Sequence, residues 1–265
     1  MTQEKVQVLW NKNVSPGYFK IGLNCQGEYS EAKPGQFVML RLCGQIEPLL
    51  RRPFSIHGLI SGNGQFQGIE ILYKVVGKFT QKLSVLKKNE SIDILGPLGS
   101  GFSIPKNIKR IFMVAGGIGV APIVFLASQL KNNEVDISQC SMFLGGRSKY
   151  DILCLDDFDQ LKMAVQLTTD DGSAGSKCLV THPLEMALAE RQPDVLYACG
   201  PQEMLKSVAV LAHKFAVKCQ VSVETMMACG MGACLGCAVE CRGASEKYLH
   251  ACYDGPVFDT NAIEL

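Results

Sequence analysis

A glycine-rich segment near the end of the 265-residue chain carries closely spaced cysteines. Cys229, Cys234 and Cys237 follow the spacing C-x4-C-x2-C, and Cys252 comes after a gap of fourteen residues. This is the spacing with which four thiolates hold a [2Fe–2S] cluster. The intervening glycines let the backbone bend around the cluster and turn N–H groups toward its sulfurs. The segment therefore predicts a [2Fe–2S] site with these four cysteines as ligands.

Two alternatives remain open for this segment. Four cysteines also suit a structural Zn²⁺ site, although zinc modules usually carry two matched C-x2-C pairs and this segment has one. Cys241 is a second candidate for the fourth ligand, but Arg242 stands where the bacterial cluster pattern has a proline. We therefore expect Cys252 to be the ligand and Cys241 to be a free thiol. The other cysteines outside the motifs are interpreted as small apolar residues; they are Cys25, Cys43, Cys140, Cys154, Cys178 and Cys219.

A glycine turn lies between an expected strand, residues 111–115, and an expected helix, residues 123–131. Glycines let the backbone approach a pyrophosphate, and the start of the helix presents a partial positive charge to it. A proline in the first helical turn needs no N–H partner. Taken alone, the motif also suits an ordinary strand-to-helix turn. We expect it to bind a dinucleotide through Gly116, Gly117, Gly119 and Pro122.

Further loops follow other expected strands in the same manner. Cys199-Gly200-Pro201 comes after residues 195–198, and Gly145-Gly146-Arg147 comes after residues 140–144. Asp170-Asp171-Gly172-Ser173 follows residues 165–168. Ligands of open α/β sheets bind at the carboxyl ends of the strands, so this regular placement predicts a nicotinamide site. Arg147 and Lys149 leave a 2′-phosphate contact open, so the sequence permits NADP as well as NAD.

A third motif, Arg52-Pro53-Phe54-Ser55, lies in the first third of the chain. The guanidinium of Arg52 can hold a phosphate, and the Ser55 hydroxyl can bond to a flavin or a phosphate. Pro53 fixes φ and removes a backbone donor. No catalytic residue is expected, because the four histidines are scattered and form no evident metal or catalytic set; they are His57, His182, His213 and His250.

The elements that must position these motifs change along the chain. Short alternating strands fill the first hundred residues and predict a small antiparallel barrel or sandwich. Strands and helices then alternate, which predicts βαβ units and a parallel sheet, with helices expected over residues 123–131, 158–163 and 202–215. From about residue 220, Cys, Gly and Met dominate. An uncharged run over residues 111–129 is long enough for a membrane span, but its glycines and Pro122 favour a buried strand, turn and helix.

Composition narrows the class of protein. Hydrophobic residues make up 47% and charged residues 19%, which suits folded cores rather than disorder. A net charge of +1 offers no basic field for nucleic acid. The first residues, Met1 to Lys5, lack the apolar stretch of a secretory signal, so we expect a cytoplasmic protein with reduced cysteines.

The three motifs together resemble the ferredoxin–NADP reductase superfamily. With the C-terminal cysteines and the ending Ala251 to Phe258, the whole chain is similar to the electron-transfer subunits of dihydroorotate dehydrogenase B. The resemblance implies three domains, in a multidomain β plus α/β fold. These are an antiparallel FAD-binding β-barrel over residues 1–100, a parallel-sheet NAD-binding domain over residues 101–219, and a small [2Fe–2S] domain over residues 220–265.

The resemblance also implies the residues that contact FAD. The family usually has Gly-Thr where this chain has Phe79-Thr80, so Phe79 departs from the pattern at a place where the backbone must come close. The implied FAD contacts are Arg52, Pro53, Phe54, Ser55, Leu72, Tyr73, Lys74, Phe79 and Thr80.

The implied function is electron transfer in pyrimidine (UMP) biosynthesis. Electrons pass from dihydroorotate to the FMN of a separate catalytic subunit, and then through the [2Fe–2S] cluster and FAD to NAD⁺. FAD is needed between the other two because nicotinamide takes a hydride and the cluster takes single electrons. The implied assembly is a heterotetramer of two subunits of each kind, and this chain alone should not oxidise dihydroorotate.

Two other functions remain as alternatives. The chain is also similar to the FAD and [2Fe–2S] small subunit of a ferredoxin:NADP or sulfide oxidoreductase, whose tail is less like residues 254–258. A non-enzymatic redox sensor or zinc module that has lost its flavin is the third interpretation, and Phe79 is the one residue that motivates it.

Overall fold

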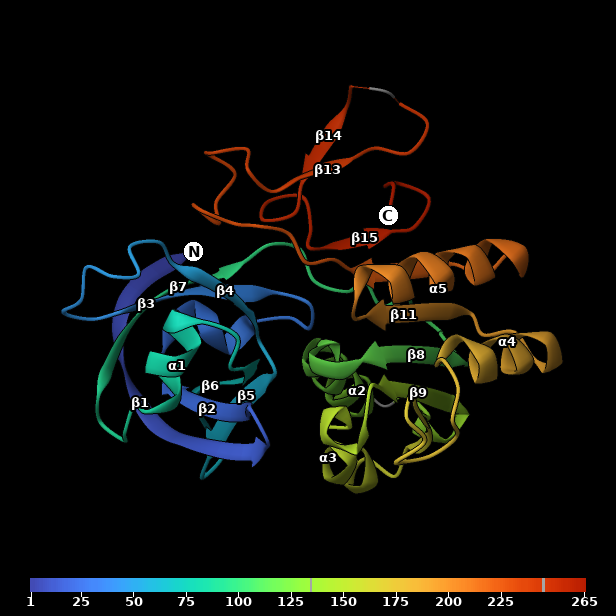
Figure 1. The fold of residues 1–265 in the computed structure, drawn as a ribbon, viewed down its shortest axis with the longest axis horizontal. Helices are drawn as coiled ribbons and strands as arrows, with labels where there is room; N and C mark the ends of the chain where they lie inside the picture. The colour runs from blue at the N-terminus through green and yellow to red at the C-terminus, as the bar shows by residue number, and fades with distance from the viewer. Residues whose placement is uncertain (134, 245) are drawn as a thin grey trace.

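The structure is a computed structural model that describes residues 1–133, 135–244 and 246–265. It consists of a curled antiparallel sheet, an α/β unit with a mainly parallel sheet, and a C-terminal cysteine-rich segment packed over both (Figure 1). The expected combination of an antiparallel barrel-like part, a parallel-sheet part and a small C-terminal part is confirmed.

The curled sheet has seven strands in the order β4-β3-β7-β1-β2-β6-β5, and every neighbouring pair is antiparallel. Alternate side chains of these strands point inward and form one buried apolar core. A short helix, α1 (Lys78–Ser84), packs against this core through Phe79 and Leu83. The strands are β1 (Thr2–Ser15), β2 (Tyr18–Asn24), β3 (Phe37–Leu42), β4 (Arg52–Ser55), β5 (Gly58–Gly62), β6 (Gln65–Lys74) and β7 (Ser91–Leu98).

The second sheet has six strands in the order β10-β9-β8-β11-β12-β15. The first five are parallel, and the last, β15, joins β12 in the antiparallel direction. Strand β8 is buried along its whole length because helices cover both faces of the sheet. The strands are β8 (Ile111–Gly116), β9 (Cys140–Gly146), β10 (Ala164–Thr169), β11 (Val195–Cys199), β12 (Cys219–Ser222) and β15 (Val257–Asp259).

Four helices cover this sheet, two on each face. Helices α2 (Val120–Asn132) and α3 (Leu155–Gln160) pack on the face formed by Ile111, Met113 and Ala115. Helices α4 (Thr181–Glu190) and α5 (Gln202–Lys214) pack on the opposite face, against Phe112 and Val114. Alternate residues of one strand therefore serve two separate cores.

The sequence predicted most of these elements, with three corrections. The expected helix over residues 158–163 instead covers Leu155–Gln160, so Met163 follows the helix. Helix α4 was not expected, and α1 begins at Lys78, before the first expected helical segment. The uncharged run over residues 111–129 is β8, a turn and most of α2, and no helix among the described residues is long and apolar enough to cross a membrane.

The C-terminal segment contains the only other sheet of the described chain, a hairpin of β13 (Ala238–Glu240) and β14 (Tyr248–His250). Strand β12 comes before this segment and β15 comes after the hairpin, and the two strands are neighbours in the sheet of the α/β unit. The cysteine-rich loop between β12 and β13 is thus anchored from both sides to the α/β unit (Figure 1).

Candidate functional site

A cleft of about 790 Å³ lies between the curled sheet and the α/β unit. It takes its lining from β4, β6, α1, the glycine turn and the segment after β12. A cleft of this size is typical of a cofactor site. The predicted site residues that line it are Arg52, Pro53, Phe54, Ser55, Leu72, Tyr73, Lys74, Phe79, Thr80, Gly119, Pro122 and Cys199.

The paired arginines of the first motif have different surroundings. Arg51 makes an ion pair with Asp93 at 2.7 Å, and Arg41 contacts the same carboxylate at 2.7 Å. Burial acts to raise the pKa of Asp93, but the two guanidinium groups beside it outweigh burial and hold that pKa below its usual value. Arg52 instead donates to the carbonyl oxygens of Leu50 and Arg51 and lines the cleft. Only Arg52 of this pair is therefore placed to receive a phosphate.

Strand β6 presents Leu72, Tyr73 and Lys74 to the cleft. The Lys74 ammonium lies 4.7 Å from the Tyr18 ring centroid and 3.5 Å from Asp151 of the α/β unit. Tyr18 donates a hydrogen bond of 2.6 Å to the same carboxylate. Lys74 thus lines the cleft and also forms an ion pair with Asp151 of the other unit.

Helix α1 accommodates Phe79, the residue that departs from the family pattern. The Phe79 ring is buried in the core of the curled sheet, with its centroid 5.8 Å from that of Phe54. The next residue, Thr80, accepts hydrogen bonds from the backbone N–H groups of Val76 and Gly77 at 2.9 and 3.1 Å. These bonds hold the turn that leads into α1. The Phe79 ring packs in the core, and the hydrogen bonds of Thr80 fix the backbone beside the cleft.

The glycine turn and the Cys-Gly-Pro loop lie directly against each other. A Cβ atom placed on Gly119 would stand 2.3 Å from the carbonyl oxygen of Cys199, and one on Gly200 would stand 3.0 Å from the backbone nitrogen of Gly116. Gly117 adopts a φ of 53°, which favours glycine. Burial raises the pKa of the Cys199 thiol to about 12 and keeps it protonated. The structure brings the two motifs together. Gly119, Pro122 and Cys199 line the cleft, whereas Gly116, Gly117, Gly200 and Pro201 do not, and Gly200 and Pro201 line a neighbouring cavity of about 510 Å³.

The segment after β12 closes the cleft on a side that the sequence analysis missed. Ser222, Glu224 and Thr225 line the cleft, together with Met227. Burial raises the pKa of Glu224. No motif in this segment signals its role, because its approach to the cleft depends on how the chain crosses from the α/β unit to the cysteines.

The cluster loop, residues 229–237, carries three of the expected cysteine ligands, and the fourth, Cys252, contacts this loop. The Cys237 and Cys252 sulfurs lie 3.2 Å apart, and Gly232 donates its backbone N–H to Cys252 at 3.1 Å. The backbone N–H groups of Met231 and Cys234 point at the Cys229 sulfur from 3.4 Å. Burial acts to raise the pKa of Cys229, but these donors outweigh it and lower that pKa to about 6, which favours the thiolate that metals bind.

This arrangement fits a sulfur-ligated iron cluster. Gly230 and Gly232 have φ values of 75° and 84°, so the loop uses left-handed turns to aim its N–H groups at sulfur. Cys241 follows β13, at the end of the hairpin where the loop to β14 begins, and it pairs with Ile263 near the end of the chain. The cluster loop also packs on the curled sheet, since a Cβ on Gly230 would stand 2.6 Å from Cγ of Met39.

Two family descriptions match the chain. Residues 224–264 match the iron–sulfur cluster binding domain of dihydroorotate dehydrogenase B, and residues 113–209 match the oxidoreductase NAD-binding domain. The first range contains the cluster loop and Cys252, and the second contains the glycine turn and the Cys-Gly-Pro loop.

Curated relatives cover most of the chain. A dihydroorotate dehydrogenase B (NAD(+)) electron transfer subunit from Desulforamulus reducens is 41% identical over 86% of this chain and 85% of its own. The subunit of the same name from Caldanaerobacter subterraneus is 37% identical over 96% and 95%, respectively.

Solved structures share the fold. A chain in the structure of an NADH-dependent reduced ferredoxin-NADP oxidoreductase, described for flavin-based electron bifurcation, is 30% identical with a TM-score of 0.84, covering 98% of this chain and 89% of that one. A ferredoxin NADP⁺ reductase from Neisseria gonorrhoeae with bound FAD and NADP is 16% identical with a TM-score of 0.68, covering 81% and 92%, and so supports the fold alone.

Proposed function

Because this chain belongs to the family of electron transfer subunits of dihydroorotate dehydrogenase B (NAD(+)), we propose that it carries electrons from a catalytic partner subunit to NAD⁺. The chain is an oxidoreductase subunit, and its family role lies in pyrimidine biosynthesis. It uses a [2Fe–2S] cluster, FAD and NAD. The flavin supplies the exchange between hydride transfer to nicotinamide and single-electron transfer to the cluster.

The residues proposed for electron transfer form three sites. In the flavin site, Arg52 holds a phosphate, Ser55 and Thr80 offer hydroxyls, and Leu72, Tyr73 and Lys74 line the ring. In the nicotinamide site, the glycine turn and the Cys-Gly-Pro loop bind the dinucleotide at the mouth of the same cleft. Cys229, Cys234, Cys237 and Cys252 ligate the cluster, while the backbone N–H groups of the cluster loop bond to its sulfurs.

One contact supports this order of centres above all. Gly230 of the cluster loop packs on Met39 of β3, and Met39 is paired with Pro53 of β4, which lines the cleft. The cluster loop is therefore separated from the proposed flavin site by adjacent residues of two paired strands. A glycine at position 230 permits this approach, because any side chain there would push the loop away from the sheet.

The partner docks, in this proposal, on the face of the cluster loop. Four large apolar side chains around the loop are exposed: Met226, Met231, Leu235 and Tyr253. An exposed apolar patch of this kind marks a protein interface. The partner is an FMN-containing dihydroorotate dehydrogenase catalytic subunit, in a heterotetramer of two subunits of each kind. It provides the base that takes the proton from dihydroorotate.

A reconstitution experiment tests the proposal. The anaerobically purified chain, loaded with FAD and iron, is mixed with the FMN-containing catalytic subunit, dihydroorotate and NAD⁺. We expect NADH to form only when both subunits are present, and each subunit alone with NAD⁺ is the control. A mixture that reduces the FMN but forms no NADH contradicts the proposed path.

The second candidate is the FAD and [2Fe–2S] small subunit of a ferredoxin:NADP oxidoreductase. It is favoured by the structural similarity to the NADH-dependent reduced ferredoxin-NADP oxidoreductase. The same purified chain is then assayed with reduced ferredoxin and with NADPH in place of NADH. Reduction of the flavin by NADPH at least as fast as by NADH, without dihydroorotate-linked activity, supports this candidate.

A further inference from the structure

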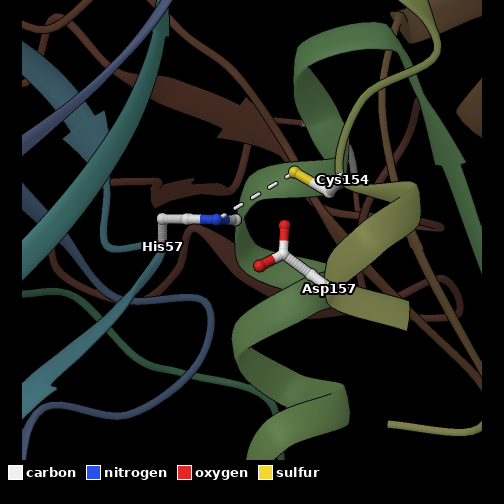
Figure 2. Close-up of side chains that lie close together, drawn as sticks. All are labelled: His57, Cys154 and Asp157. Carbon is white, nitrogen blue, oxygen red and sulfur yellow. Dashed lines mark hydrogen bonds between the residues drawn. The ribbon is translucent and has the colours of Figure 1, made fainter. Parts of the chain in front are cut away.

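A cluster of potential metal ligands lies at the interface between the curled sheet and the α/β unit, away from the cysteine loop. His57 comes from the turn between β4 and β5, Cys154 immediately precedes α3, and Asp157 lies on α3 (Figure 2). The ligand atoms of these three side chains all lie within 4.8 Å of one another. Figure 2 shows the imidazole pointing from the curled sheet toward the sulfur and the carboxylate.

The hydrogen bonding of His57 leaves one ring nitrogen directed into the cluster. Its Nδ1 lies 3.0 Å from the carbonyl oxygen of Ala121, which can only accept, so we assign the proton to Nδ1. The lone pair of Nε2 then faces the Cys154 sulfur at 4.0 Å and a carboxylate oxygen of Glu70 at 3.3 Å. His57 is only 2% exposed, and burial lowers its pKa to about 4, so the ring is neutral. Metal-binding histidines have this arrangement, with one nitrogen fixed by a backbone carbonyl and the other free.

The charges around the cluster leave room for a divalent cation. Lys20 lies between two carboxylates of this cluster, 2.9 Å from Asp157 and 3.6 Å from Glu70. Burial strongly raises the pKa of the Cys154 thiol and also raises the pKa of Glu70, so without a metal the thiol is neutral. A divalent cation would balance the negative charges of the Asp157 carboxylate and of the Cys154 thiolate that forms when the thiol proton leaves.

We propose that His57, Cys154 and Asp157 form a zinc site that links the curled sheet to the α/β unit, with Glu70 beside the fourth position. A donor set of one nitrogen, one sulfur and one oxygen suits zinc. Zinc bond lengths place tetrahedral ligand atoms about 3.3–3.8 Å apart. Side-chain rotations that move the ligand atoms by about 1 Å would therefore bring them to zinc-binding distances. The Cys154 S–H bond breaks, its proton passes to solvent and a Zn–S bond forms, with no change of oxidation state. The inference is independent of the proposed electron-transfer function.

The experiment uses the full chain loaded with FAD and iron. The protein is incubated with zinc chloride, freed of loosely held metal, and analysed for zinc and iron together. We expect one zinc per chain with no loss of iron. The zinc X-ray absorption spectrum should show one sulfur at about 2.3 Å and nitrogen or oxygen at about 2.0–2.2 Å, whereas zinc in the cluster loop would be surrounded by sulfur alone.

Variants identify the ligands. Cys154→Ser should weaken zinc binding by more than about 100-fold, since loss of an outer partner of a ligand alone weakens it about 10–100-fold. Cys178→Ser, at another half-buried cysteine, is the matched control and should bind like the unmodified chain. Lys20→Gln should tighten zinc binding, because it removes the cation that competes for Asp157 and Glu70, and this outcome does not depend on a variant that loses a ligand.

Three results would overturn the proposal. The first is that the unmodified chain takes up no zinc, which leaves a proton shared among His57, Cys154 and Glu70 as the explanation of the geometry. The second is equal uptake by the unmodified chain and Cys154→Ser. The third is zinc gained only in proportion to iron lost, which places the metal in the cluster loop.

Discussion

Replacing Gly119 with alanine tests how the nicotinamide site is assembled. The added Cβ would lie 2.3 Å from the Cys199 carbonyl oxygen, 2.5 Å from its carbon and 2.6 Å from the Gly200 nitrogen. All three are backbone atoms in a loop that follows a central strand, so no flexible side chain can move to relieve the contact. The glycine turn and the Cys-Gly-Pro loop must therefore separate.

The size of that separation sets the expected effect. Ordinary contacts begin near 3.4 Å, so the two backbones must move apart by about 1 Å. A misplacement of about 1 Å in a reacting pair can slow its reaction about 100-fold, and overpacking a core destabilises it by about 1–3 kcal/mol. We therefore expect Gly119→Ala to slow reduction of the bound FAD by NADH about 100-fold while the chain stays folded and retains FAD.

The assay is the anaerobic bleaching of the flavin's visible absorption by NADH in a stopped-flow instrument. Gly58→Ala is the matched control, since a Cβ at Gly58 meets no atom within 4 Å. FAD content and thermal unfolding are measured for both variants. If Gly119→Ala keeps both its FAD and the unmodified rate of bleaching, the close approach of the two loops has no part in hydride transfer and the reasoning fails.

Three further predictions concern the cluster, the paired arginines and acid stability. Cys252→Ser should lose the cluster iron while Cys241→Ser keeps it, as measured by iron content; the reverse result moves the fourth ligand to Cys241. Arg52→Ala should lower the retained FAD with little change in unfolding, whereas Arg51→Ala should destabilise the fold by about 1–3 kcal/mol in urea, because the buried Asp93 carboxylate loses one of its two ion pairs. The depressed pKa of Asp93 stabilises the fold above its unfolded pKa of about 3.9, and that stability is lost as pH falls through the lower folded pKa. Asp93→Asn should flatten this acid limb of the unfolding curve, and an unchanged limb contradicts the assignment.

Local patterns in the sequence predicted the strands and loops that carry the cofactor motifs. The run Ile111–Ala115 is a central strand because its apolar residues serve cores on both faces of the sheet. The glycines at 116, 117 and 119 mark the turn that follows it, because a Cβ at Gly119 would meet the Cys199 carbonyl and Gly117 has a φ of 53°. At these positions, the residues that form the sequence pattern are also the residues whose packing explains the structure.

Relations between distant segments could not be predicted in this way. Arg51 and Arg52 are adjacent and chemically alike, and only the position of Asp93 on β7 separates the structural arginine from the one at the cleft. His57 and Cys154 are 97 residues apart, and each alone suits a core position. Phe79 departed from a family pattern that needs a small residue, yet a pocket formed with Phe54 accommodates its ring. Each outcome depends on tertiary packing that no local spacing encodes.

The attachment of the C-terminal segment explains why this chain can hold a cluster and a cleft in one arrangement. Strand β15 follows Cys252 closely and pairs with β12, so the fourth expected ligand is fixed to the sheet of the α/β unit. Gly230, at the other end of the loop, packs on Met39 of the curled sheet. The cluster loop therefore contacts both units that border the cleft. A rotation of one unit against the other would move one anchor of this loop relative to the other, so the position of the loop beside the cleft depends on its contacts with both units.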